Sequence, residues 1–206
     1  MNTMYIQPTS LRARGFTLIE LMVVVVIMAL LAALTMGAYQ YAQTAAARNR
    51  THATMAALEG GLERYNSDFG EYPAPSNPTR TDEFNGKTYI AGGAAMLYQA
   101  MSGDGTNAID LATGGGVGSN GRIEDDEDAN VKMTDIPAQI WMQQNGSYYM
   151  IDGFRKPFQY TKGGDPNAVN PTYDLWSYGQ DETNTRLSSI DAKSNPTTSA
   201  KWIKNW

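Results

Sequence analysis

The chain has 206 residues, of which 42% are hydrophobic, and a formal net charge of −5 at pH 7. This length supports one modest globular core, and a negative charge disfavours general nucleic-acid binding, which depends on neutralising phosphates. The chain has no cysteine and a single histidine, so it has neither a thiolate nucleophile nor a histidine cluster. It also lacks a Gly-x-Ser-x-Gly nucleophile motif, and we expect a protein that is not an enzyme.

An apolar run of about 20 residues, at positions 16–36, follows a short leader that carries Arg12 and Arg14. A helix of this length crosses a bilayer, and the basic leader stays in the cytoplasm, so the rest of the chain lies outside. The run contains the carboxylate of Glu20, and Gly15 stands directly before it. A secretory signal peptide would place its small-residue cleavage site after the apolar core instead. Cleavage after Gly15 would leave the apolar helix on the mature protein.

The sequence Gly-Phe-Thr-Leu-Ile-Glu, from Gly15 to Glu20, resembles the processing site of type IV pilins and type II secretion pseudopilins. In these proteins a prepilin peptidase cuts after the glycine and methylates the new N-terminus. The resemblance implies that residues 1–15 are a leader peptide and that Phe16 becomes the first mature residue. Residues 16–36 would then form the transmembrane and assembly half of a long helix.

Glu20 is the predicted assembly residue. A carboxylate in hydrocarbon costs a few kcal/mol on insertion scales, so it needs a partner, and the α-amino group that cleavage creates on Phe16 is cationic near neutral pH. The pair can form within one helix, because the two residues are at i and i+4. Glu20 can equally bind the amine of a neighbouring subunit and set the axial register of assembly, as the resemblance suggests. The alternative is a simple membrane anchor whose Glu20 reaches toward the headgroups.

The helical pattern continues beyond the apolar run to Asp68, and Gly70 and Pro73 end it. Its apolar residues are spaced three and four apart, and we expect them to form the core: Met55, Leu58, Leu62, Tyr65 and Phe69. A short helix is expected around residues 94–101. A glycine-rich acidic loop follows at about residues 102–132.

The last third of the chain has aromatic, partly alternating segments at residues 147–151, 158–160 and 173–178. Such segments, separated by glycine and proline turns, predict a small antiparallel sheet. The predicted fold class is therefore α+β. A long N-terminal helix, transmembrane in its first half and amphipathic in its second, packs on this sheet. Residues 37–206 would form the periplasmic globular domain, which includes the second half of the helix.

Three more regions resemble the major pseudopilin of type II secretion systems: residues 65–73, the paired segments 152–160 and 173–181, and residues 202–206. The resemblance implies a pilin fold and a structural subunit that polymerises into a periplasmic pseudopilus. Its partners would be copies of itself, the prepilin peptidase, the inner-membrane assembly platform and minor pseudopilins. The protein would cross the bacterial inner membrane once, with its C-terminal domain in the periplasm and its filament there or outside the cell.

Two other functions fit parts of the sequence. A type IV pilus subunit for adhesion, motility or DNA uptake shares the N-terminal half, although the missing cysteines and the Tyr-Asp-x-x-Ser motif at Tyr173 favour the secretion side. A membrane-anchored periplasmic binding domain would keep its leader and would use the acidic loop for a ligand.

In the pseudopilin family a calcium ion commonly holds the C-terminal loop. The resemblance implies Asp181 and the Tyr178 carbonyl as its ligands, and Asp191 on the intervening loop is a further candidate. Lys201 and Trp202 stand where the family has two adjacent aspartates. Because calcium takes several oxygen ligands, this loss weakens the predicted site. We expect the Lys201 ammonium to replace the ion and to pair with Asp181.

Overall fold

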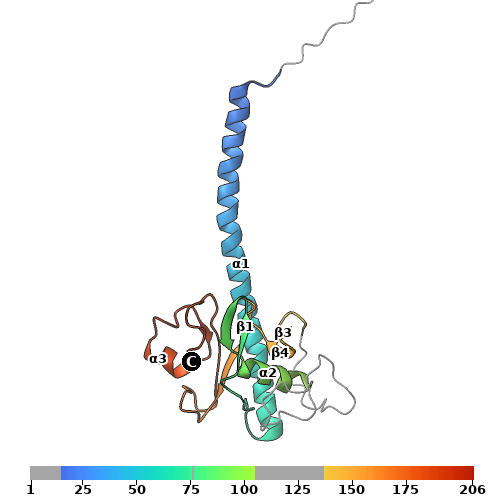
Figure 1. Ribbon diagram of the computed structural model, residues 1–206, viewed down its shortest axis with the longest axis vertical. Helices are drawn as coiled ribbons and strands as arrows, with labels where there is room; N and C mark the ends of the chain where they lie inside the picture. The colour runs from blue at the N-terminus through green and yellow to red at the C-terminus, as the bar shows by residue number, and fades with distance from the viewer. Residues whose placement is uncertain (1–14, 76, 105–136) are drawn as a thin grey trace, which may run out of the picture. The chain divides into compact units, whose positions relative to one another are not determined.

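The computed structural model describes residues 15–75, 77–104 and 137–206. Within these residues three helices and seven strands follow one another, and this confirms the α+β class (Figure 1). The chain divides into two units, residues 1–43 and 44–206. The helix α1 (Leu18–Phe69) contributes to both.

In the first unit, α1 is apolar and uncovered. The mean hydropathy of its most apolar 18-residue window is 2.8, and none of that window is buried. Among the described helices, α1 is the one long and apolar enough to cross a membrane. The membrane-spanning segment predicted at residues 16–36 lies in the first unit. All of it except its first two residues, which precede Leu18, belongs to α1.

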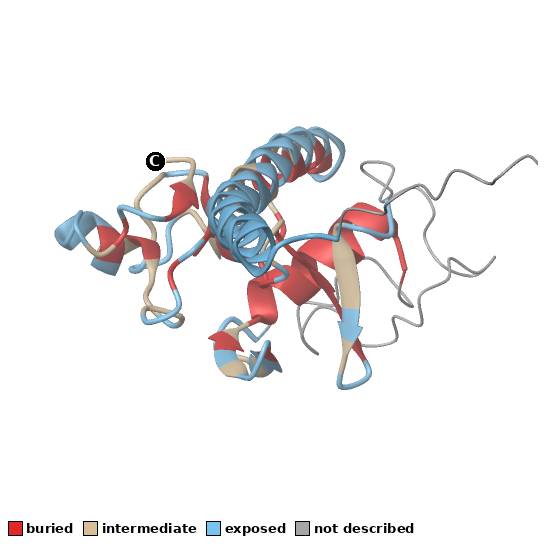
Figure 2. Ribbon diagram, turned by 90° about the horizontal axis from the view of Figure 1, so that it is seen from above, coloured by how far each residue is buried: buried red, intermediate tan, exposed pale blue. Residues whose placement is uncertain are grey.

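In the second unit, one face of α1 enters the hydrophobic core, and the buried residues of the helix are confined to this part (Figure 2). Leu58 and Leu62 are fully buried, and Met55 and Tyr65 lie beside them, as their spacing predicts. The prediction for Phe69 is wrong. This last helical residue is 44% exposed, and its ring contacts that of Tyr65, with 4.5 Å between the ring centroids.

Two hairpins follow α1. Strands β1 (Thr81–Phe84) and β2 (Lys87–Ile90) form one, and β3 (Trp141–Gln144) and β4 (Ser147–Met150) form the other. Each two-residue turn is Asn-Gly with positive φ at both positions, which is the backbone that a tight hairpin of this kind requires: Asn85-Gly86 and Asn145-Gly146.

The remaining strands form a three-stranded antiparallel sheet in the order β5 (Gln159–Lys162), β6 (Tyr173–Ser177) and β7 (Ile203–Lys204). A short helix, α3 (Ser189–Ser194), lies between β6 and β7 in the chain. The strands are antiparallel as predicted, but they form three small sheets rather than one.

The predicted short helix is present as α2 (Gly92–Ser102), and every one of its residues is buried. It contacts both β4 and β5, which belong to different sheets. Its small residues, such as Ala94 and Ala95, allow this close packing, so α2 forms the centre of the second unit. The predicted acidic loop lies outside the described residues, except for its first three positions.

The turn at residues 152–156, which links β4 to β5, is held against α1. The Gly153 N–H donates to the hydroxyl oxygen of Thr51 at 3.0 Å, and Thr51 itself donates to the Ala47 carbonyl. A Cβ atom on Gly153 would lie 2.1 Å from that carbonyl oxygen. Only glycine therefore lets the turn approach the helix this closely.

Asp152 organises the same turn from inside. One of its carboxylate oxygens accepts the backbone N–H groups of Phe154 and Lys156, both at 2.8 Å, and the other accepts the Ser177 hydroxyl from β6. Burial raises the pKa of Asp152 to about 6, although these hydrogen bonds favour the ionised form. The buried carboxyl therefore binds a proton more readily than an exposed one does.

Truncation of the core face of α1 tests its packing. We expect Leu58→Ala to lower the free energy of unfolding by about 2–5 kcal/mol, because it leaves a cavity in a fully buried position. Phe69→Ala should cost about 1 kcal/mol or less, since it removes one exposed ring contact. Chemical denaturation of the full chain in detergent measures both, and equal losses would contradict the assignment of Phe69 to the surface.

The Asp152 carboxyl should make the folded domain less stable as the pH rises from about 4 to about 6. In this interval the folded carboxyl, with a pKa of about 6, holds more protons than the unfolded one, with its ordinary pKa near 4. Asp152→Asn keeps the shape without the titration and should remove this decline, as urea denaturation across the interval would show. An unchanged pH slope in the variant would contradict the assignment.

Candidate functional site

The start of α1 is built around Thr17. Residues 15–17 are not helical, and Leu18 is the first helical residue. The Thr17 carbonyl accepts the Leu21 N–H at 3.2 Å, so Thr17 takes the N-cap position. Glu20 is then the third helical residue, close to the positive end of the helix dipole.

Thr17 and Glu20 form a reciprocal pair of hydrogen bonds. The Thr17 backbone N–H and hydroxyl donate to Oε2 of Glu20 at 2.9 and 2.8 Å, and the Glu20 N–H donates to the Thr17 hydroxyl oxygen at 3.3 Å. This is a capping box, which satisfies two backbone donors that the helix itself leaves unbonded. Thr17 is not among the site residues predicted from the sequence, although Thr-x-x-Glu before an apolar run is the recognised signal of a capping box.

The predicted pair between Glu20 and the Phe16 amine stays a prediction. In the described chain the Phe16 nitrogen follows Gly15 in a peptide bond, and Phe16 is 83% exposed. The three hydrogen bonds of the capping box all involve either the Glu20 backbone or Oε2. The second oxygen, Oε1, accepts none from the described residues, so it is oriented by the cap and open to a cation.

At the other end of the chain, the Asp181 carboxylate lies in the loop after β6 and accepts five hydrogen bonds. Thr183 donates its N–H and hydroxyl, Asn184 its N–H and side-chain amide, and Trp202 its indole N–H at 2.9 Å. Burial opposes the ionisation of Asp181. The bonds from Trp202, Asn184 and Thr183 together outweigh it and hold the pKa of Asp181 well below its usual range.

The other two predicted calcium ligands are used elsewhere. The Tyr178 carbonyl accepts the Asp181 N–H at 2.9 Å, so it closes a turn. The Asp191 carboxylate accepts the Ser188 N–H and hydroxyl, in the capping box that begins α3. The structure therefore gives these residues separate structural roles.

The expected pair between Lys201 and Asp181 is absent from the described structure, and this prediction is wrong. The Lys201 side chain is exposed, and its neighbour Trp202 is the residue that donates to the Asp181 carboxylate. A different lysine reaches the same loop. The ammonium of Lys156 donates to the carbonyls of Gly179 and Asp181.

The residues present do not fit a calcium ion. Calcium takes six to eight oxygen ligands, usually with several carboxylates. No group of three or more acidic or histidine side chains converges within the described ranges. The one carboxylate in the loop, that of Asp181, is occupied by neutral donors, and a lysine already contacts the loop carbonyls.

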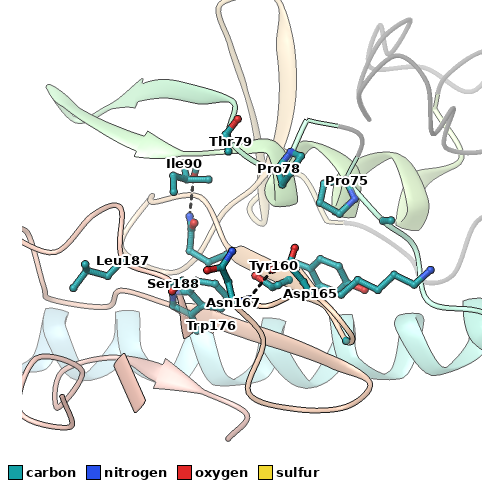
Figure 3. A pocket seen from close by; sticks show the side chains of 15 residues that line it. Pro75, Pro78, Thr79, Ile90, Tyr160, Asp165, Asn167, Trp176, Leu187 and Ser188 are labelled. Atoms are coloured by element: carbon teal, nitrogen blue, oxygen red, sulfur yellow. Dashed lines mark hydrogen bonds between the residues drawn. The ribbon is translucent and has the colours of Figure 1, made fainter. Parts of the chain in front are cut away.

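A cavity of about 410 Å³ opens between the connector before β1 and the strands β5 and β6 (Figure 3). Pro75 and Pro78 line one side, and Tyr160 and Trp176 line the other. The amide of Gln159 in its wall donates to the carbonyls of Ile90 and Pro157. The Gln159 amide nitrogen is therefore already bonded to the backbone around the cavity.

Comparison with known proteins agrees with the N-terminal geometry. Residues 10–36 match the family model of the prokaryotic N-terminal methylation motif. The chain is 42% identical over 62 residues to the type II secretion system core protein G of Klebsiella pneumoniae. The N-terminal part of the chain is thus similar to type IV pilin-like proteins. The match covers 30% of this chain and 44% of the relative, so it spans less than half of the relative's length. No solved structure matches the chain.

The segment that matches the methylation motif contains the whole capping box. Gly15, Phe16, Thr17 and Glu20 all lie within the matched residues. The motif therefore has two roles in this chain. It supplies the predicted cleavage junction, and it fixes the first helical turn and the direction of the Glu20 carboxylate.

Removal of the cap should loosen the first turn of α1. We expect Thr17→Ala to destabilise this turn by about 1 kcal/mol, because the N-cap hydroxyl and its bond to Glu20 are lost. Thr17→Ser keeps the hydroxyl and serves as the control. Amide hydrogen exchange of residues 18–21 in detergent measures the effect, and equal exchange in wild type and Thr17→Ala would contradict the capping role.

Proposed function

We propose that this chain is a structural subunit of a pilin-like filament, and that the filament is the periplasmic pseudopilus of a type II secretion system, with this chain as its major pseudopilin. The observation that carries the proposal is the methylation motif at residues 10–36, which opens directly into an uncovered apolar helix. The identity to a type II secretion core protein supports the choice of system. The subunit works mechanically and is not an enzyme.

In this proposal the prepilin peptidase cuts after Gly15 and methylates Phe16. The leader at residues 1–15 is removed, and residues 16–36 anchor the subunit in the inner membrane, with residues 37–206 in the periplasm. The length and hydropathy of α1 support the anchor. The inner-membrane assembly platform then adds subunits to a helical homopolymer, and minor pseudopilins complete it.

Glu20 is the proposed assembly residue. The capping box holds its carboxylate at the start of the helix and leaves Oε1 open, and cleavage supplies a cationic amine on Phe16. In a subunit bundle that excludes water, this pair attracts much more strongly than it would at a surface. The amine can belong to the same chain or to the neighbouring subunit.

We expect Glu20→Ala to leave membrane insertion and cleavage intact but to abolish or strongly reduce filaments, because the buried amine loses its counter-charge. The matched control is Thr35→Ala. It removes another polar side chain of the same apolar segment, and the Thr35 hydroxyl donates to the Ala32 carbonyl within its own helix. Electron microscopy of filaments, with immunoblots for processing, gives the result, and normal filaments from Glu20→Ala would contradict the assembly role.

The choice between a secretion pseudopilus and a type IV pilus needs a cellular test. Both share the N-terminal motif on which the family match rests. Deletion of the gene in the native host should retain normally exported proteins in the periplasm and leave surface pili and twitching motility unchanged. Loss of pili, motility or DNA uptake with normal secretion would instead assign the chain to a type IV pilus.

A further inference from the structure

Lys156 carries its positive charge inside the second unit. The residue is 4% exposed, and its ammonium donates to the carbonyl of Gly179 at 2.7 Å and to that of Asp181 at 2.9 Å. Both carbonyls belong to the loop after β6, which is 23 and 25 residues further along the chain. The ammonium therefore joins the turn after β4 to this loop.

The backbone of Lys156 is fixed at both of its polar atoms. Its N–H donates to the Asp152 carboxylate at 2.8 Å, and its carbonyl accepts the Asp152 N–H at 2.8 Å. Arg155, just before it, takes a left-handed φ of 60°. The turn at residues 152–156 thus sets the direction in which the lysine extends.

The charge is compensated mainly by backbone dipoles. Within the described ranges, no carboxylate lies at ion-pair distance from the ammonium. Burial lowers the pKa of Lys156, and attraction from Asp152, Glu182 and Asp181 opposes this shift. A buried charge is costly unless fixed polar groups surround it, and converging carbonyls are what protein loops offer to hard cations.

The rest of the loop is complete without a metal. Trp202, Asn184 and Thr183 supply neutral donors to the Asp181 carboxylate. Gly179 has a positive φ, and a Cβ atom there would lie 2.6 Å from the Lys201 carbonyl oxygen, so the loop passes tightly against the C-terminal segment. Two carbonyls of this loop accept hydrogen bonds from the Lys156 ammonium, whereas the Asp181 carboxylate accepts one from the Trp202 indole.

We propose that the Lys156 ammonium is a built-in cation that holds the loop at residues 178–184, in the role that the family resemblance gives to calcium. The loop forms without a metal ion, and this holds whichever filament the chain builds. The contact consists of the Lys156 ammonium and the Gly179 and Asp181 carbonyls to which it donates.

Wild-type protein provides the first test. Thermal melts of the full chain in detergent, followed by circular dichroism, should give the same Tm in excess chelator and in millimolar calcium. Hydrogen exchange of the amides at residues 179–184 should also be the same in both. A lower Tm or faster exchange in chelator would overturn the proposal.

A matched pair of variants provides the second test. Lys156→Met keeps the stem and removes the charge, and it should lower Tm by several degrees and speed exchange at residues 179–184. Lys87→Met is the control. Lys87 also bonds to this loop, through the carbonyl and carboxylate of Glu182, but as an exposed surface pair, so its loss should change little.

The outcomes are distinct. A Lys156→Met protein that melts and exchanges like wild type would overturn the proposal. If that variant fails to fold, the wild-type comparison in chelator and calcium still decides, because a loop held by a metal ion loses protection in chelator and one held by lysine does not.

Discussion

The apolar surface of α1 has to be removed from water, and nothing in the described part of a single chain covers it. Large side chains from Leu18 to Met36 are exposed in the isolated chain. Contiguous apolar surface of this extent is found where lipid or a protein partner lies. In the proposed function lipid covers it in the stored subunit, and other copies of the helix cover it in the filament. In this proposal, exchange between these two environments allows a subunit to be both stored and polymerised.

The same constraint explains the chemistry at the first turn. Unbonded backbone donors and a lone carboxylate are costly in an apolar surrounding. Thr17 and Glu20 satisfy one another there, so the helix can begin within the apolar run. The capping box uses one carboxylate oxygen and orients the other. A local rule of helix formation thus prepares the group that the proposed assembly step needs.

Features that depend on neighbours in sequence could be predicted. The spacing of Met55, Leu58 and Leu62 identified the core face of α1, and composition located α2. The prediction that Phe69 is a core residue was wrong because periodicity indicates which face of the helix a residue occupies, and not how far along the helix the core extends. Both Asn-Gly hairpins carried a readable signal that was not used, and so did the Thr-x-x-Glu cap.

The contacts of the C-terminal loop could not be predicted from neighbouring residues in the sequence. Lys201 looked like the partner of Asp181 because of its place in the family pattern, but the ring of Trp202 occupies that side and the ammonium comes from Lys156. That contact depends on the turn held by Asp152 and on the approach of Gly153 to α1. Neither is a periodic or local property, so only the folded chain reveals which lysine is inside.

The proposed function requires that this chain is made as a precursor and matured into a filament subunit. The most direct measurement is the intact mass and N-terminal sequence of the protein purified from the membranes of its native host. We expect a chain that begins at Phe16 and carries one methyl group on its amine. A chain that still contains residues 1–15 would contradict it and would favour an anchored periplasmic domain that does not polymerise.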